Sequence, residues 1–210
     1  MAADPHQVIG NELDPGERLL WSGQPRRGIV FRGTDVFMIP FSLLWGGFAI
    51  FWEAAVLWGG HHGQGKVPFF FALWGVPFIL IGLYLIFGRF LVDAAQRENT
   101  YYGLTDRRAI IVFGLFGSQP RGLAILIYML AGVAWRRTKA IDLRTLTDIE
   151  MTESSDGSGT INLGPRPANY WWHTGEMPGL GHKLMYPNFE FIPNVKQVFN
   201  QLRAARGSSY

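Results

Sequence analysis

Residues 99–114, NTYYGLTDRRAIIVFG, predict the fold of the region around them. Two short runs rich in aromatic and β-branched residues flank the polar sequence TDRR, a pattern typical of two antiparallel strands joined by a turn. The stretch begins about ten residues after a long apolar segment ends at Gly88. We therefore expect a β-sheet domain that is tethered closely to a membrane-type segment.

The composition indicates that part of the chain is adapted to lipid. Of 210 residues only 17% are charged, whereas the chain has 16 Phe and 8 Trp, and the apolar residues are concentrated in two blocks. The net charge of +3 is too small and too scattered to predict a nucleic-acid-binding surface. The sequence has no cysteine, which excludes disulfides, thiolate nucleophiles and thiolate metal ligands.

The two apolar blocks have the length of membrane spans. Residues 36–58 contain one charged residue and residues 67–88 contain none. Each would form a helix of roughly 33 Å, enough to cross a hydrocarbon core of about 30 Å. Only residues 59–66 separate them, so residues 36–88 predict a transmembrane helical hairpin.

Basic residues indicate the orientation of this hairpin. The connecting loop carries Lys66 alone, whereas several arginines flank the hairpin: Arg18, Arg26, Arg27, Arg32, Arg89 and Arg97. The positive-inside rule then places both termini in the cytoplasm, with residues 1–35 as a cytoplasmic N-terminal segment. The first 18 residues lack the basic start and cleavage site of a signal peptide, so the first span is expected to remain as an anchor.

Glu53 is the one ionisable residue inside the predicted spans. A charge within a bilayer is costly unless it is paired or neutralised, so Glu53 is a candidate functional residue. It lies only five residues from the outer end at Trp58, which allows its carboxylate to reach headgroups or water. The alternative is a pairing partner in another subunit.

Small residues and proline predict how the two helices pack. Gly46, Gly47, Gly75 and Gly82 are expected to let the helices approach closely. Pro77 lies inside the second span and predicts a kink there.

Beyond the hairpin, residues 97–206 predict a small domain with short strands. Apolar residues alternate at 140–143, 148–152, 160–163 and 189–192, and the sequence SSDGSG at 154–159 predicts a turn. Near the end, Val195, Val198, Phe199 and Leu202 form one apolar stripe of a helix that begins after Asn194. The expected fold class is α+β: an antiparallel β-roll capped by a C-terminal α-helix.

Several motifs, in this order, resemble the bacterial membrane-anchored proteins with a pleckstrin-homology-like (PH-like) domain. They are LDPGERLLWSGQP at 13–25, the two spans, YYGLTDRRAIIV at 101–112, DLRTLTDIEM at 142–151 and the terminal helix. The resemblance covers most of the chain from about residue 8 to 205. It implies a small bent sheet capped by a helix, held at the cytoplasmic face of the bacterial inner membrane. Some proteins of similar build assist the assembly of photosynthetic reaction centres, and no catalytic residues come with the resemblance.

Residues 122–135, GLAILIYMLAGVAW, depart from the short turn expected in this family. They are too short for a third span, so they predict either a core helix of the domain or a membrane-embedded or partner-binding helix. The candidate binding residues here are Leu123, Ile125, Ile127, Tyr128, Leu130 and Trp135.

Two further groups are candidates for contacts with partners or lipid. Trp171 and Trp172, in the loop 169–186, favour a protein partner or the membrane interface, unless they cover an open side of the sheet. Arg107, Arg108, Arg136 and Arg137 are candidates for anionic headgroups, with solvated turn charges as the alternative.

The function that these patterns favour is that of a non-enzymatic membrane protein. We expect an accessory, scaffold or assembly component that binds an integral-membrane partner or a second copy of itself. The first alternative is a module that binds anionic membrane lipids. The least favoured is a membrane-bound enzyme or a metal site built from His173, Glu176 and His182, whose spacing matches no closed metal motif. No cofactor, metal or nucleic acid is expected.

Overall fold

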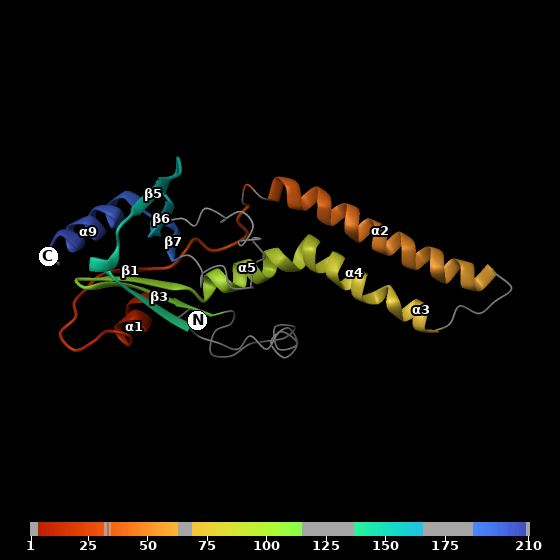
Figure 1. Cartoon of the computed structure of the whole chain (residues 1–210), viewed down its shortest axis with the longest axis horizontal. Coiled ribbons are helices and arrows are strands. Elements are labelled where there is room, and N and C mark those ends of the chain that lie inside the picture. Colours follow the sequence, from red (N-terminus) through yellow and green to blue (C-terminus); the bar gives the residue numbers. More distant parts are fainter. Residues whose placement is uncertain are drawn as a thin grey trace. The chain divides into compact units, whose positions relative to one another are not determined.

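A computed structural model of the chain (Figure 1) describes residues 4–31, 33, 35–62, 69–114, 137–165 and 187–208. The fold is α+β and divides into two compact units. Unit 1 comprises Met1–Gly28 and Asp93–Tyr210, and unit 2 comprises Ile29–Val92. Unit 2 is therefore an insertion in the sequence of unit 1. The sequence predicted a domain at 97–206 alone, whereas unit 1 also contains the N-terminal segment Met1–Gly28.

Four antiparallel strands form the first sheet of unit 1, in the order β1-β2-β3-β4. They are β1 (Leu19–Gly23), β2 (Tyr101–Thr105), β3 (Arg108–Phe113) and β4 (Arg137–Asp142). The hairpin predicted within 99–114 is confirmed as β2 and β3, with Leu104 opposite Ala109 next to the turn. Strand β1 was not predicted, although it pairs with β2 over most of its length.

Strand β3 is a continuous apolar run after Arg108, without alternating polar residues, because it is buried on both faces. Ile111 faces the main core, whereas Ile110 and Val112 pack with Ile9 on the opposite face. Ile9 belongs to the short helix α1 (Pro5–Gly10), which Asp4 caps by accepting a hydrogen bond from the His6 amide. Helix α1 was likewise not predicted, and its burial of Ile9 explains the apolar run in β3.

The second sheet of unit 1 has the antiparallel order β5-β6-β7. A single 3₁₀ turn (η2, Leu143–Thr145) leads from the first sheet to β5 (Ile149–Glu153), which is followed by β6 (Gly159–Leu163) and β7 (Asn188–Ile192). The predicted turn between β5 and β6 is confirmed, and Gly157 has the positive φ of 75° that glycine permits.

The C-terminal helix α9 (Val195–Ser208) covers the core that the two sheets share. The predicted stripe is confirmed, because Val195, Val198 and Leu202 are buried with Tyr102 of β2 and Phe189 of β7. Asn194 precedes the helix with a φ of 51°, not the extended backbone of an ordinary N-cap.

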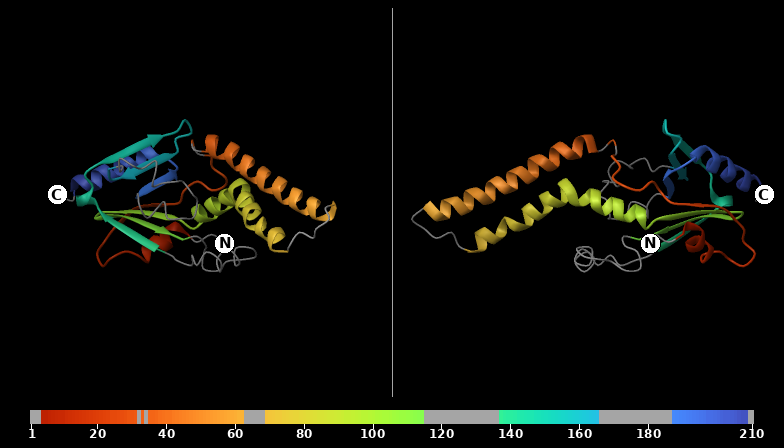
Figure 2. Two further views of the ribbon diagram at one scale, coloured as in Figure 1. Left: turned by 45° about the vertical axis from the view of Figure 1, so that its right-hand side comes forward. Right: turned by 180° about the vertical axis from the view of Figure 1, so that it is seen from behind.

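Unit 2 consists of helices that Figures 1 and 2 show running side by side. They are α2 (Asp35–His62), α3 (Phe69–Trp74), α4 (Val76–Leu83), the π-helical turn η1 (Tyr84–Gly88) and the start of α5 (Arg89–Glu98). Two stretches, Asp35–Trp58 and Val76–Glu98, are long and apolar enough to cross a membrane.

The second apolar segment differs in detail from the expected single helix at 67–88. The chain bends at Gly75, and Pro77 occupies the first turn of α4, where a missing amide hydrogen costs little. The helical path then continues through η1 and α5 to Glu98, ten residues past the predicted end. The kink predicted at Pro77 therefore lies at Gly75, two residues earlier in the chain.

Candidate functional site

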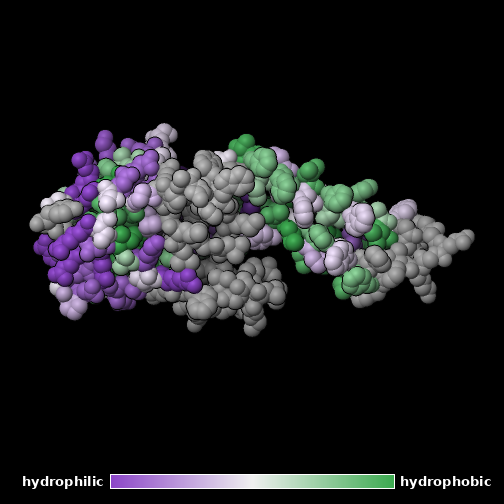
Figure 3. All heavy atoms as spheres, viewed as in Figure 1, coloured by the Kyte–Doolittle hydropathy of each residue, from purple (hydrophilic) through white to green (hydrophobic). Residues whose placement is uncertain are grey.

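Exposed apolar side chains are segregated in unit 2. Among the described residues, every large apolar side chain that is exposed lies between Ile29 and Leu91, with Leu20 of β1 as the exception. Val36, Phe37 and Leu44 are at least 75% exposed. Figure 3 shows the hydrophobic residues gathered over the helices and the hydrophilic ones over the sheets. A surface of this kind is unusual in a soluble monomer and needs an apolar environment.

Two glycines set the closest approach of α2 and α4. A Cβ added at Gly82 would lie 2.8 Å from the Cα of Gly46, and one added at Gly46 would lie 2.9 Å from Cδ1 of Ile86. Gly47 has nothing within 4 Å of such an atom. Of the predicted packing glycines, Gly46 and Gly82 therefore form the crossing, and Gly47 does not.

Gly82→Ala is expected to destabilise the helix pair by about 2 kcal/mol, because the new methyl group has to push a backbone away. Gly47→Ala is the matched control, and its effect should stay within about 0.5 kcal/mol. Unfolding of the full chain by increasing dodecyl sulfate in mixed micelles measures both. Equal stabilities of the two variants would contradict the crossing.

Glu53 lies between the two helices. Its side chain is buried, with the residue 8% exposed, and Oε2 has no hydrogen-bond partner among the described residues. Its carboxyl group packs on the backbone of Gly75, where any side chain would overlap Oε2. The sequence singled out Glu53, but the structure shows it covered by the helix pair, which argues against the interpretation that it reaches water at the outer end.

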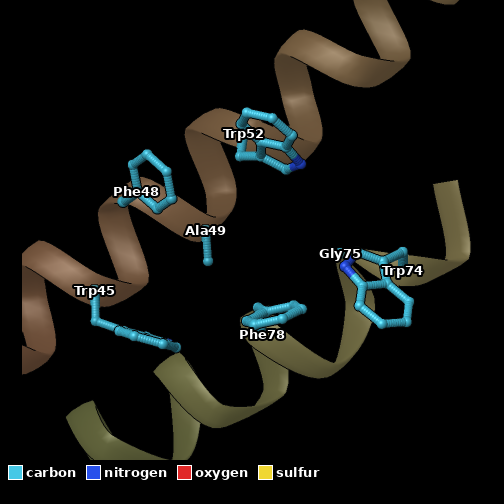
Figure 4. Close-up of a pocket in the computed structure, with 7 residues that line it drawn as sticks. All are labelled: Trp45, Phe48, Ala49, Trp52, Trp74, Gly75 and Phe78. Carbon is cyan, nitrogen blue, oxygen red and sulfur yellow. The ribbon is translucent and has the colours of Figure 1, made fainter. Parts of the chain in front are cut away.

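An aromatic groove adjoins this carboxylate. It has a volume of about 270 Å³ and is lined by five rings, those of Trp45, Phe48, Trp52, Trp74 and Phe78, together with Ala49 and Gly75 (Figure 4). Gly75 is the common element, since it lines the groove and also contacts Glu53. The groove could not be recognised in the sequence, because its rings come from three helices: α2, and α3 and α4 on either side of the break at Gly75.

An ion pair joins the other ends of the helices of unit 2. Arg89 NH1 lies 2.9 Å from Oδ1 of Asp35, and both side chains are buried. The guanidinium group of Arg89 also lies 4.4 Å from the ring centre of Phe90. The pair connects the first residue of α2 to the first residue of α5.

In unit 1, Arg108 is bound to the N-terminal segment. Its Nε lies 2.9 Å from Oε1 of Glu17, and its NH2 lies 2.8 Å from Oε2. Glu17 also accepts hydrogen bonds from the hydroxyl of Thr105 and the amide of Asp14. Burial alone would raise the pKa of Glu17, but the hydrogen bonds from Arg108, Asp14 and Thr105 hold it below its ordinary value.

Glu17→Ala is expected to destabilise unit 1 by about 3 kcal/mol, because Arg108 and Thr105 lose a shared acceptor. The folded-state pKa of Glu17 lies below the unfolded value, so its contribution is complete above pH 4.5 and is lost as the pH falls through the lowered pKa. Chemical denaturation between pH 3 and 7 tests both effects. The exposed Glu153→Ala is the control, and a Glu17 variant with the same acid sensitivity as wild type would contradict the assignment.

Arg97 connects two distant segments of unit 1. It is 1% exposed, and its NH2 donates to the carbonyl oxygen of Gly28 at 2.6 Å and lies 2.7 Å from Oδ2 of Asp93. Its guanidinium group also lies 5.9 Å from the ring centre of Phe191. Gly28 and Asp93 are the residues at which unit 1 is interrupted, so Arg97 holds the two interrupted ends together. In the sequence, Arg97 indicated only the orientation of the hairpin, and its role within unit 1 was not predicted.

The structure separates the four arginines predicted to contact headgroups. Arg107 is exposed in the β2–β3 turn, and Arg137 is exposed on the edge strand β4. Arg108 instead forms an ion pair with Glu17, and 23% of its side chain is exposed. Arg136 lies outside the described residues.

The remaining candidates also lie outside the described residues. These are Leu123, Ile125, Ile127, Tyr128, Leu130 and Trp135 in 122–135, and Trp171, Trp172, His173, Glu176 and His182 in 169–186. Within the part of the chain that the structure describes, no group of three His, Asp or Glu residues is placed to hold a metal ion.

Comparison of the chain with protein-family models, curated proteins and solved structures found no match.

Proposed function

We propose that this chain is a non-enzymatic protein of the bacterial inner membrane, anchored by the helical hairpin of unit 2. Unit 1 is its cytoplasmic PH-like module, and the module acts as an accessory or assembly component that binds another membrane protein.

The segregation of exposed apolar side chains supports the anchor and carries the proposal. The core helix of a soluble protein would be mostly buried, whereas only 22% of an apolar 18-residue window in each candidate span is buried here. Lipid supplies the apolar environment that the rings and aliphatic side chains of unit 2 require.

Strand pairing supports a hairpin topology. Unit 2 joins β1 to β2, and these strands pair with each other in one sheet. Both ends of the hairpin must therefore be on the same side of any bilayer that it crosses, which requires an even number of crossings. The arginines that flank the hairpin favour the cytoplasmic side.

The architecture of unit 1 supports a PH-like module. A four-stranded and a three-stranded antiparallel sheet enclose one core, and a C-terminal helix covers it, as the family resemblance implies. A folded module that is tethered at the membrane meets membrane partners at a high effective concentration, which suits an accessory role.

Purification of the tagged full-length chain from native membranes tests the accessory role. In a mild detergent, one integral membrane protein should co-purify with the tagged chain in a stoichiometric amount. Replacing residues 122–135 by a short Gly-Ser turn should remove that protein while the chain stays in the membrane. A chain that purifies alone from crosslinked native membranes would contradict the proposal.

Binding of anionic lipid by unit 1 is the second candidate function. Arg107, exposed at the tip of the β2–β3 turn, favours it. A chain in which about six Gly and Ser residues replace residues 29–92 should then bind phosphatidylglycerol vesicles in a salt-sensitive way. Arg107→Ala should weaken this binding about fivefold, corresponding to roughly 1 kcal/mol for each basic residue near the surface. Arg144→Ala, an exposed arginine elsewhere in unit 1, is the control.

A further inference from the structure

We propose that the aromatic groove beside Glu53 is the docking site for a transmembrane helix of another protein, and that a Lys or Arg of this helix pairs with the Glu53 carboxylate. The inference rests on the proposed membrane anchor and specifies the kind of partner that it binds.

Glu53 provides a buried carboxyl oxygen that can pair with a cation. The side chain is more than nine-tenths buried, and Oε2 has no hydrogen-bond partner among the described residues. Within a membrane, acidic groups are retained where they pair with a complementary group, because neither lipid nor an apolar helix face compensates for the lost hydration.

The groove provides the space and the chemistry for a basic side chain. Its faces include the rings of Trp45, Trp52 and Trp74, which attract cations through their π systems (Figure 4). Gly75 has no side chain between the groove and the carboxyl group of Glu53. Glu53 itself does not line the groove, so a basic group of the partner has to reach past the backbone of Gly75 to pair with the carboxylate.

The depth of the groove favours a helix over a lipid headgroup. Trp45 lies 13 residues before Trp58, or about 20 Å along α2 from the outer end of the first span. A headgroup stays at the surface of the bilayer, whereas a transmembrane helix can follow the groove along its length.

A second copy of the hairpin has no Lys or Arg at the depth of Glu53, and its Lys66 lies beyond the outer end of the span. Residues 36–58 and 67–88 contain neither Lys nor Arg. The partner is therefore a different membrane protein, with a basic residue at about the depth of Glu53, roughly 8 Å from the outer end of its span.

A defined peptide tests this inference on the full-length chain in phosphatidylcholine vesicles. The probe is a leucine-rich transmembrane peptide with one Lys about 8 Å from its outer end, and the matched probe has Gln at that position. The chain has no cysteine, so a donor dye on Gln64→Cys reports energy transfer to an acceptor on the peptide.

We expect the Lys peptide to bind about tenfold more tightly than the Gln peptide. Glu53→Gln should abolish this difference, and Trp52→Ala should weaken binding of the Lys peptide. Because the two peptides are compared on the same labelled chain with Glu53 intact, their difference does not depend on the folding of a Glu53 or Trp52 variant.

Equal binding of the two peptides, or a Lys preference that survives Glu53→Gln, would overturn the inference. A preference that appears only when phosphatidylglycerol replaces phosphatidylcholine would also overturn it, because surface charge would then explain the binding. If the hairpin inserts in the vesicles but the peptides bind equally, the docking site alone fails. If the hairpin does not insert, the proposed anchor fails as well.

Discussion

Replacing residues 29–92 by about six Gly and Ser residues is expected to convert this chain into a water-soluble protein that still unfolds cooperatively. The replacement removes every exposed large apolar side chain among the described residues except Leu20. It leaves the core between the two sheets and α9 intact, because all of its residues belong to unit 1. Arg97 holds Gly28 and Asp93 together, so a short linker can join them without strain.

Gel filtration and urea denaturation measure this result. The matched control is a fragment that starts at residue 97, which lacks β1, α1 and the Glu17 acceptor of Arg108. It leaves the edge of β2 and the buried Ile110 and Val112 exposed, and should aggregate or unfold without cooperativity. An insoluble linker variant, or a soluble and cooperative fragment, would contradict the division into two units.

Arg97→Ala is expected to destabilise unit 1 by about 4 kcal/mol. The substitution removes a buried cation that binds Asp93 and the carbonyl oxygen of Gly28, and an uncompensated buried group costs more than the pair contributes. Arg97→Lys should recover less than half of the loss, since one ammonium group cannot reproduce the planar guanidinium group that contacts both partners and Phe191.

Urea denaturation of the linker variant that lacks residues 29–92 gives these values without interference from the helices of unit 2. Arg144→Ala, at an exposed arginine, serves as the control and should change stability by less than about 0.5 kcal/mol. A cost below about 1 kcal/mol for Arg97→Ala would mean that the two interrupted ends are held together by other contacts.

The strands and the last helix could be predicted because their patterns are local. Residues 99–114, the turn at 154–159 and the stripe of Val195, Val198 and Leu202 each contain their own signal. Strand β1 was missed because it is only half-buried, and its role depends on pairing with β2, some 80 residues later. Alternation gave no signal here, because a bulge between Leu19 and Trp21 places these two side chains on opposite faces of the sheet.

The candidate site was predictable only in part. Glu53 stands out in the sequence as the one carboxylate inside the predicted spans, but its burial depends on the backbone of Gly75, in the break between α3 and α4. Trp45, Phe48 and Trp52 are spaced to share one helix face, yet the groove also needs Trp74 and Phe78 across the bend. Arg108 was assigned to lipid because its partner, Glu17, is 91 residues away in the sequence.

Cysteine accessibility in sealed membrane vesicles tests the central claim most directly. The chain contains no cysteine, so Gln7→Cys, Gln64→Cys and Ser155→Cys each give a single reactive thiol. The account predicts that a membrane-impermeant maleimide labels Gln64→Cys from the outer face only. It should label Gln7→Cys and Ser155→Cys, both at exposed positions of unit 1, from the cytoplasmic face only. Labelling of the latter two from opposite faces, or of all three from one face, would contradict it.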